Sequence, residues 1–215
     1  MPSTQHTDNL IGGLARQAGS SLVADPRAFK TVLIVATLCS LGISVALVLA
    51  LIGSRPDFAA AEHRAALVYK IVSMLMLSLG GLFLASRAAL PGSGRLTLAA
   101  LVPAVIVLGF RAVTDRSGLS ALGGSASSTY GCVLIIVGAS FLPLVILLRV
   151  LRIGAPTRPA LTGAIAGLLA GALGATAYAI ACRNDGGLYV AIWYPVGVLV
   201  MAALGAAIGR RVLAW

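Results

Sequence analysis

The sequence predicts an all-α, polytopic integral membrane protein with six transmembrane helices and both termini in the cytoplasm. Of its 215 residues, 59% are hydrophobic and only 10% are charged, and the apolar residues gather in six long runs. A soluble domain has about 25% charged residues, so this chain has too few to cover a surface in contact with water. Long unbroken runs also differ from the short alternating segments of an outer-membrane barrel.

Residues 1–30 form the longest polar stretch, which is too short for a hydrophobic core of its own. Thr7-Asp8-Asn9 offers helix-capping side chains at the start of a short amphipathic pattern. The apolar residues on one face of that helix are Leu10, Ile11, Leu14 and Ala18. So short a helix is marginal alone and forms properly only against a partner. We therefore treat residues 1–30 as a cytoplasmic segment and residues 31–215 as the transmembrane domain.

The six predicted spans each have close to the ~20 residues that a helix needs to cross a bilayer. They are Thr31–Ile52, Leu67–Ala85, Leu96–Val113, Tyr130–Leu148, Ala160–Ala181 and Leu188–Ile208. Pro103, Pro143 and Pro195 fall inside spans three, four and six, where we expect them to kink the helices. Lys70 lies inside span two, about a turn from the outer edge, and we expect its ammonium group to snorkel to the interface.

Lys and Arg residues in the connecting segments predict the orientation. Ten lie on one side: Arg16, Arg27, Lys30, Arg87, Arg95, Arg149, Arg152, Arg158, Arg210 and Arg211. Five lie on the other: Arg55, Arg64, Arg111, Arg116 and Arg183. The richer side should face the cytoplasm, together with both termini. The net charge of +10 is spread over these segments, so membrane topology explains it better than binding to nucleic acid.

Span five carries a stripe of small residues at four-residue spacing, Gly163, Gly167 and Gly171. Such a stripe lets the backbone of another helix approach closely, and we expect this to be packing within the chain rather than a dimer contact. The aromatic residues at the outer ends of spans five and six are expected to be interfacial anchors. They are Tyr178, Tyr189, Trp193 and Tyr194.

The chain has three cysteines. Cys39 lies in the interior of span one, where we expect a small packed hydrophobic side chain. Cys132 and Cys182 both fall at the predicted outer boundary, within reach of water and oxidants. Spans four and five should be antiparallel neighbours, so the Cα separation of about 4.4–6.8 Å that a disulfide requires is attainable. Three interpretations remain open for this pair: simple packing, a permanent disulfide, or a pair that switches with oxidant or a thiophilic metal.

Other chemistry has little support in the sequence. No Asp, Glu or His lies centrally in a span, and His6 and His63 fall in different compartments, so they cannot share a metal. We therefore expect no enzyme activity, no cofactor and no resident metal ion. A small transporter or channel is one alternative, but the spans offer hardly any polar lining. A thiol-linked membrane oxidoreductase is another, but it needs a CxxC-like pair and a second pair to pass electrons on.

The C-terminal part of the chain carries the most specific motifs. They are Gly154-Ala-Pro-Thr-Arg-Pro159, Gly163-Ala-Ile-Ala-Gly167, Ala177-Tyr178, Cys182, Ala191-Ile-Trp-Tyr194 and Gly209-Arg-Arg-Val-Leu-Ala-Trp215. Arg55-Pro56-Asp57, Lys70, Cys132 and Asp8-Asn9-Leu10-Ile11 fit the same pattern. In these residues the sequence resembles the NrsF-type anti-sigma factors, six-span inner-membrane proteins that restrain an extracytoplasmic-function (ECF) sigma factor.

The resemblance implies a bacterial inner-membrane protein whose cytoplasmic N-terminal segment holds an ECF sigma factor away from RNA polymerase. Asp8, Leu10, Ile11 and Leu14 would contact the sigma factor. Oxidative or heavy-metal stress at Cys132 and Cys182 would change the packing of spans four and five and release it. The expected partners are therefore the sigma factor and membrane lipid, with no direct contact to nucleic acid.

Overall fold

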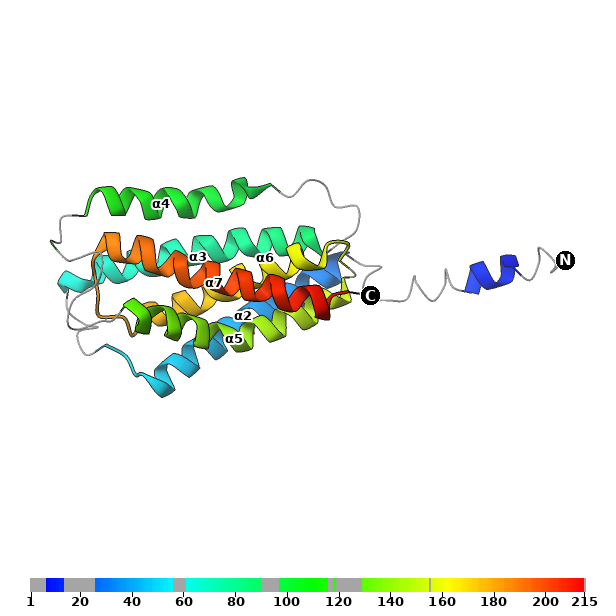
Figure 1. Ribbon diagram of the computed structural model, residues 1–215, viewed down its shortest axis with the longest axis horizontal. Helices are drawn as coiled ribbons and strands as arrows, with labels where there is room; N and C mark the ends of the chain where they lie inside the picture. The colour runs from blue at the N-terminus through cyan, green and yellow to red at the C-terminus, as the bar shows by residue number, and fades with distance from the viewer. Residues whose placement is uncertain are drawn as a thin grey trace.

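Long helices that run side by side make up the molecule (Figure 1). The computed structural model describes residues 7–13, 26–55, 61–89, 97–115, 118, 129–154 and 156–214. Beyond a short helix at residues 7–13, the elements are α2 (Pro26–Leu51), α3 (Ala61–Ala88), a 3₁₀ turn η2 (Leu98–Leu101), α4 (Val102–Val113), α5 (Thr129–Ile153), α6 (Pro159–Ala179) and α7 (Gly187–Val212). No strand occurs within these ranges, so the predicted all-helical class is confirmed.

Five of the helices, α2, α3, α5, α6 and α7, are long and apolar enough to cross a membrane. The sixth apolar segment, Leu98–Val113, is shorter and begins with the 3₁₀ turn. Pro103 lies in the first turn of α4, so the expected kink inside a span is wrong there. Proline is tolerated at this position because the first N–H groups of a helix have no partner within it. Pro143 and Pro195 do lie inside α5 and α7.

Helix α6 is the centre of the bundle and contacts α2, α3, α5 and α7. Every residue from Leu169 to Ala179 is buried. A helix that is apolar all round is typical of a protein core or of a membrane span, and α6 is enclosed by its neighbours. The glycine and alanine residues of α6 make this possible, because they let four neighbours approach its backbone.

The glycine stripe of α6 faces α7. A Cβ atom added at Gly163 would overlap the carbonyl oxygen of Gly205, and one at Gly167 would overlap that of Met201. At Gly171 it would lie 2.9 Å from the Cα atom of Val198. The two backbones are therefore in direct contact along the stripe, and these glycines pack within the chain.

Gly167→Ala is expected to lower the free energy of unfolding by about 1–3 kcal/mol, because α6 and α7 must move apart to admit one methyl group. Thermal unfolding of the purified protein in detergent measures this. Gly138→Ala in α5 is the matched control, since no heavy atom of a neighbouring element lies within 4 Å of the added methyl group. Equal stability of the two variants would contradict the close α6–α7 contact.

Positive charge is concentrated at one end of the bundle. The start of α2 and the end of α7 lie together at this end (Figure 1). Eight Lys and Arg side chains here are exposed: Arg27, Lys30, Arg87, Arg149, Arg152, Arg158, Arg210 and Arg211. We refer to it as the basic end. At the opposite end lie the C-terminus of α2, the first turns of α3, α5 and α7, and the turn between α6 and α7.

Candidate functional site

Cys132 and Cys182 lie in one buried cluster at the end opposite to the basic end. Cys132 is in the first turn of α5 and Cys182 is in the turn that follows α6. Each residue is only 1% exposed, and all three cysteines are free thiols. The expected direct access of this pair to water is therefore wrong, because both side chains point into the bundle. Cys39 is also placed differently from expectation: it is exposed on the outer face of α2.

Tyrosine side chains surround the two thiols. The side chains of Tyr178, Tyr189 and Tyr194 are buried and pack in the same cluster as the two thiols. The rings of Tyr178 and Tyr194 are 6.0 Å apart between centroids. All five residues belong to one packed cluster, so the tyrosines are part of the thiol site and not the interfacial anchors that the sequence suggested. We call these five residues the thiol cluster.

An ion cluster lies directly beside the thiols and joins three segments of the chain. The carboxylate of Asp185 accepts hydrogen bonds from Arg55 at 2.9 and 3.1 Å and from Lys70 Nζ at 2.8 Å. Lys70 Nζ also donates to the backbone carbonyl of Cys182 at 3.2 Å, and Arg55 Nη1 donates to the same oxygen at 3.5 Å. Lys70 is fully buried, so the expectation that it snorkels to the interface is wrong. Its ammonium group is satisfied inside the protein instead.

Asp185 is ionised at neutral pH. Burial alone would raise the pKa of its carboxyl group, but the hydrogen bonds and charges of Arg55 and Lys70 outweigh burial and lower the pKa from 3.8 to about 2. A carboxyl group whose pKa is lower in the folded than in the unfolded state stabilises the fold above its unfolded pKa. That stabilisation is lost as the pH falls through the folded pKa.

The Asp185 contribution to thermal stability is therefore expected to be constant from pH 8 to about pH 4 and to disappear between about pH 4 and pH 2. The melting temperature of the wild-type protein minus that of Asp185→Asn, measured in detergent over this range, reports it. A difference that instead vanishes near pH 6 would contradict the lowered pKa.

The turn between α6 and α7 is held by further polar contacts. Asp115, which follows α4, accepts a hydrogen bond from the backbone N–H of Leu188 at 2.9 Å. The side-chain oxygen of Asn184 accepts one from the N–H of Gly186 at 3.0 Å. Gly187 leaves room for α4, because a Cβ atom there would lie 2.9 Å from the carbonyl oxygen of Arg111. The thiol cluster is thus covered by an ordered polar turn.

Comparison with known proteins identifies the protein family. The family model described as negative regulator of sigma F matches residues 17–215, most of the chain. The chain belongs to the NrsF family. A probable anti-sigma-F factor NrsF of Azospira oryzae is 32% identical over 218 residues, which cover 97% of this chain and 99% of the relative. An anti-sigma-F factor NrsF of Caulobacter vibrioides is 32% identical over 217 residues, with the same coverage. No solved structure matches.

Sequence reasoning missed the ion cluster of this NrsF family member. It treated Arg55 as a loop charge and part of a family motif and Lys70 as able to reach water, and it connected neither residue with Asp185. One signal was available, because a lysine inside an apolar span must find a partner or a water-filled path. The partner could not be named, since Asp185 is 115 positions away in the sequence. Within the described residues, no three His, Cys, Asp or Glu side chains lie close enough to hold a metal ion.

The N-terminal residues predicted to contact a sigma factor are only partly described. Residues 7–13 are helical, and Asp8 is exposed there. Leu10 and Ile11 are each 58% exposed. Leu14 lies outside the described residues. Leu10 and Ile11 are thus available for a partner.

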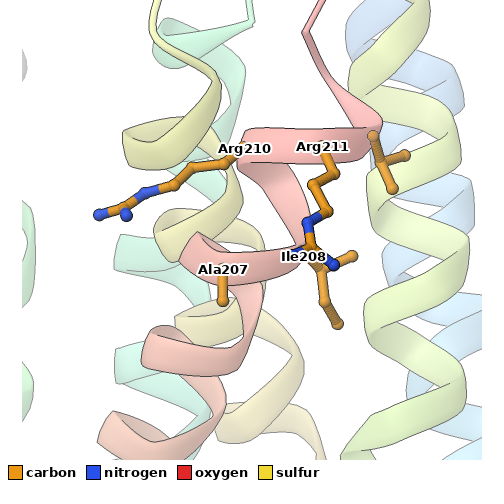
Figure 2. Close-up of a pocket in the computed structure, with 5 residues that line it drawn as sticks. Ala207, Ile208, Arg210 and Arg211 are labelled. Carbon is orange, nitrogen blue, oxygen red and sulfur yellow. The ribbon is translucent and has the colours of Figure 1, made fainter.

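The basic end has a hollow of about 520 Å³ at the end of α7. It is lined by Ala207, Ile208, Arg210, Arg211 and Val212. Figure 2 shows the side chains of Arg210 and Arg211 leaving the helix in different directions. Two guanidinium groups that diverge do not enclose one anion, so this hollow is an exposed basic surface of the NrsF bundle and not a built anion site.

Proposed function

We propose that this protein is a membrane anti-sigma factor. Residues 1–30 sequester an ECF sigma factor, and a reaction at Cys132 and Cys182 under oxidative or heavy-metal stress releases it. The observation that carries the proposal is membership of the NrsF family over residues 17–215. The placement of both thiols in one packed cluster supports the sensing part, because a disulfide or a shared metal ion needs the two sulfur atoms close together.

The proposed topology has six crossings of the bacterial inner membrane, with both termini and the basic end in the cytoplasm. The eight exposed Lys and Arg side chains at that end support this orientation. The start of α2 and the end of α7 lie at the same end of the bundle, which requires an even number of crossings (Figure 1). In the proposed topology, Leu98–Val113 is the sixth crossing, beside the five longer helices.

The segment Leu98–Val113 is suited to such a crossing despite its shortness. At ~2.0 Å per residue in the 3₁₀ turn and ~1.5 Å in the helix, it is roughly 26 Å long, slightly less than the ~30 Å hydrocarbon core. A modest local thinning of the bilayer covers the difference. Its exposed side chains are apolar: Leu98, Val102, Val105, Ile106, Phe110 and Val113.

The N-terminal helix is the proposed contact with the sigma factor. Leu10 and Ile11 would enter an apolar groove of the partner, as amphipathic helices commonly do. A helix of this length forms stably only when bound. Binding and folding of the segment are therefore coupled, and a small structural change near its attachment to α2 is enough to alter the affinity.

The sensing step is a reaction between the two thiols and the stress agent. In oxidation, Cys132 and Cys182 each lose a proton and together give two electrons to the oxidant as the disulfide forms. With a heavy-metal ion, both thiols lose their protons and the two thiolates bind the metal. Either product replaces two separate thiols in the packed cluster by one rigid unit. The packing of α5, α6 and α7 around them must change, because a close-packed cluster has no room for the new geometry.

Membrane fractionation of the native host tests the proposal. In unstressed cells the sigma factor that this protein binds is expected in the membrane fraction. After dichromate, cadmium or peroxide it is expected in the soluble fraction. Cells that lack this protein are the control, because there the sigma factor should be soluble throughout. A sigma factor that is soluble in unstressed wild-type cells would contradict the proposal.

A further inference from the structure

We propose that Arg55, Lys70 and Asp185 form a latch between the Cys182 turn and α2, and that opening this latch transmits the thiol reaction to the N-terminal segment. The inference rests on the proposed function, because it takes Cys132 and Cys182 as the sensor and residues 1–30 as the output. It adds the connection between them, which lies along α2.

The latch holds the peptide group of Cys182 itself. Its carbonyl oxygen accepts hydrogen bonds from Lys70 on α3 and from Arg55, which follows α2. The backbone N–H of Arg55 donates to the carbonyl of Ile180 at 3.4 Å, so main chain and side chain both join this turn. Asp185 accepts hydrogen bonds from both cations. Only three bonds separate the Cys182 sulfur atom from this carbonyl carbon, so a reaction that fixes the position of the sulfur atom also constrains the peptide group that Arg55 and Lys70 hold.

Breaking these contacts is an all-or-none event. The side chains of Arg55 and Lys70 are 2% and 0% exposed, and Asp185 is the carboxylate that both contact. A buried charge that loses its partner is strongly unfavourable until water reaches it. Partial separation is therefore avoided, and the latch is either closed and dry or open and hydrated. Such a bistable element can convert a small change at a sulfur atom into a discrete change elsewhere.

Helix α2 connects the latch to the output. It has 26 residues, and at ~1.5 Å per residue it is about 39 Å long, which spans the bundle from the latch to the basic end. The N-terminal segment precedes its first residue, Pro26. A single stripe of the helix is buried: Phe29, Leu33, Thr37, Ser40, Ser44 and Val48. The rest of its described surface is at least partly exposed, so α2 lies at the periphery of the bundle.

The contact of α2 with its neighbours is also less tightly packed than that of α7. An apolar hollow of about 310 Å³ lies beside the contact between its C-terminal half and α5, lined by Leu47, Val48 and Leu51 on one side and Ile135 and Ala139 on the other. The buried hydroxyl group of Ser40 has no hydrogen-bond partner among the described residues. Helices α6 and α7, in contrast, are joined by direct backbone contact. Of these helices, α2 has the room to shift when the latch opens.

The test introduces Asp185→Asn into a chain that already carries Cys132→Ser and Cys182→Ser. No reaction at Cys132 or Cys182 is possible in this background, so a loss of capture caused by Asp185→Asn does not arise from these two thiols. We expect the parent to hold the sigma factor in the membrane and Asp185→Asn to bind it roughly tenfold more weakly without stress, as usual for allosteric coupling. Undiminished capture at equal protein level would overturn the latch. A parent that captures no sigma factor would instead overturn the proposed function.

Two further variants distinguish the loss of the latch contacts from a general loss of structure at this end of the bundle. Lys70→Met leaves Arg55 and Asp185 as a neutral pair but removes the bond from Lys70 to the Cys182 carbonyl. Lys70→Met should also weaken capture of the sigma factor. If Asp185→Asn does not accumulate in the membrane, Lys70→Met tests the latch in its place. Asp115→Asn is the matched control, because this carboxylate at the same end bonds to Leu188 of α7. Capture should be unchanged in Asp115→Asn, and an equal loss in all three variants would overturn the latch.

Discussion

Leu10→Asp and Ile11→Asp are each expected to abolish capture of the sigma factor by membranes that hold this protein. Both side chains are 58% exposed in the structure, so their replacement does not disturb the bundle. In a complex they would be buried in an apolar groove, where an unpaired carboxylate costs about 3–5 kcal/mol. At about 1.4 kcal/mol for each factor of ten, this lowers the affinity by more than about a hundredfold.

The measurement is co-sedimentation of the purified sigma factor with membranes that contain each variant in equal amounts. Asn9→Asp is the matched control, because it adds the same charge on the opposite face of the same helix. It should bind like the wild-type protein. Equal binding by Leu10→Asp and Asn9→Asp would show that this apolar face is not the anchor.

The double variant Cys132→Ser/Cys182→Ser is expected to hold the sigma factor normally and to lose the response to dichromate, cadmium and peroxide. Serine is close to cysteine in size and its hydroxyl group can still contact the neighbouring tyrosines, so the resting packing is kept. It can form neither a disulfide nor a tight thiolate–metal bond. The induced change in sigma-dependent transcription should fall from at least about tenfold to none.

A reporter gene under the control of the sigma factor measures this response. Cys39→Ser is the control for general effects of removing a thiol from the protein. Its side chain lies on the exposed face of α2, away from the thiol cluster, so it should leave induction unchanged. A normal response in the double variant would remove Cys132 and Cys182 as the sensor, even if capture of the sigma factor is confirmed.

The helices themselves were predictable from the sequence. Apolar runs near the thickness of a bilayer can only be helices, because every backbone polar group must be satisfied within the segment. The runs ending at Ile52 and at Ile208 therefore correspond to α2 and α7 within a few residues. The placement of Cys132 and Cys182 at the same end also followed from counting the predicted spans. These properties depend on local composition and on the number of crossings.

Only the tertiary structure decided which way side chains face. In a membrane the outside of the bundle is as apolar as its inside, so hydropathy does not distinguish a lipid-facing residue from a core residue. This is why Cys39 is exposed, whereas Tyr189 and Tyr194 are buried. The contact of Lys70 with Asp185 depends on how α3 packs beside the turn after α6, and no local pattern encodes it. The sequence determined the long helices and the end of the bundle at which the thiols lie, and the packing of the helices determined which residues contact the thiols.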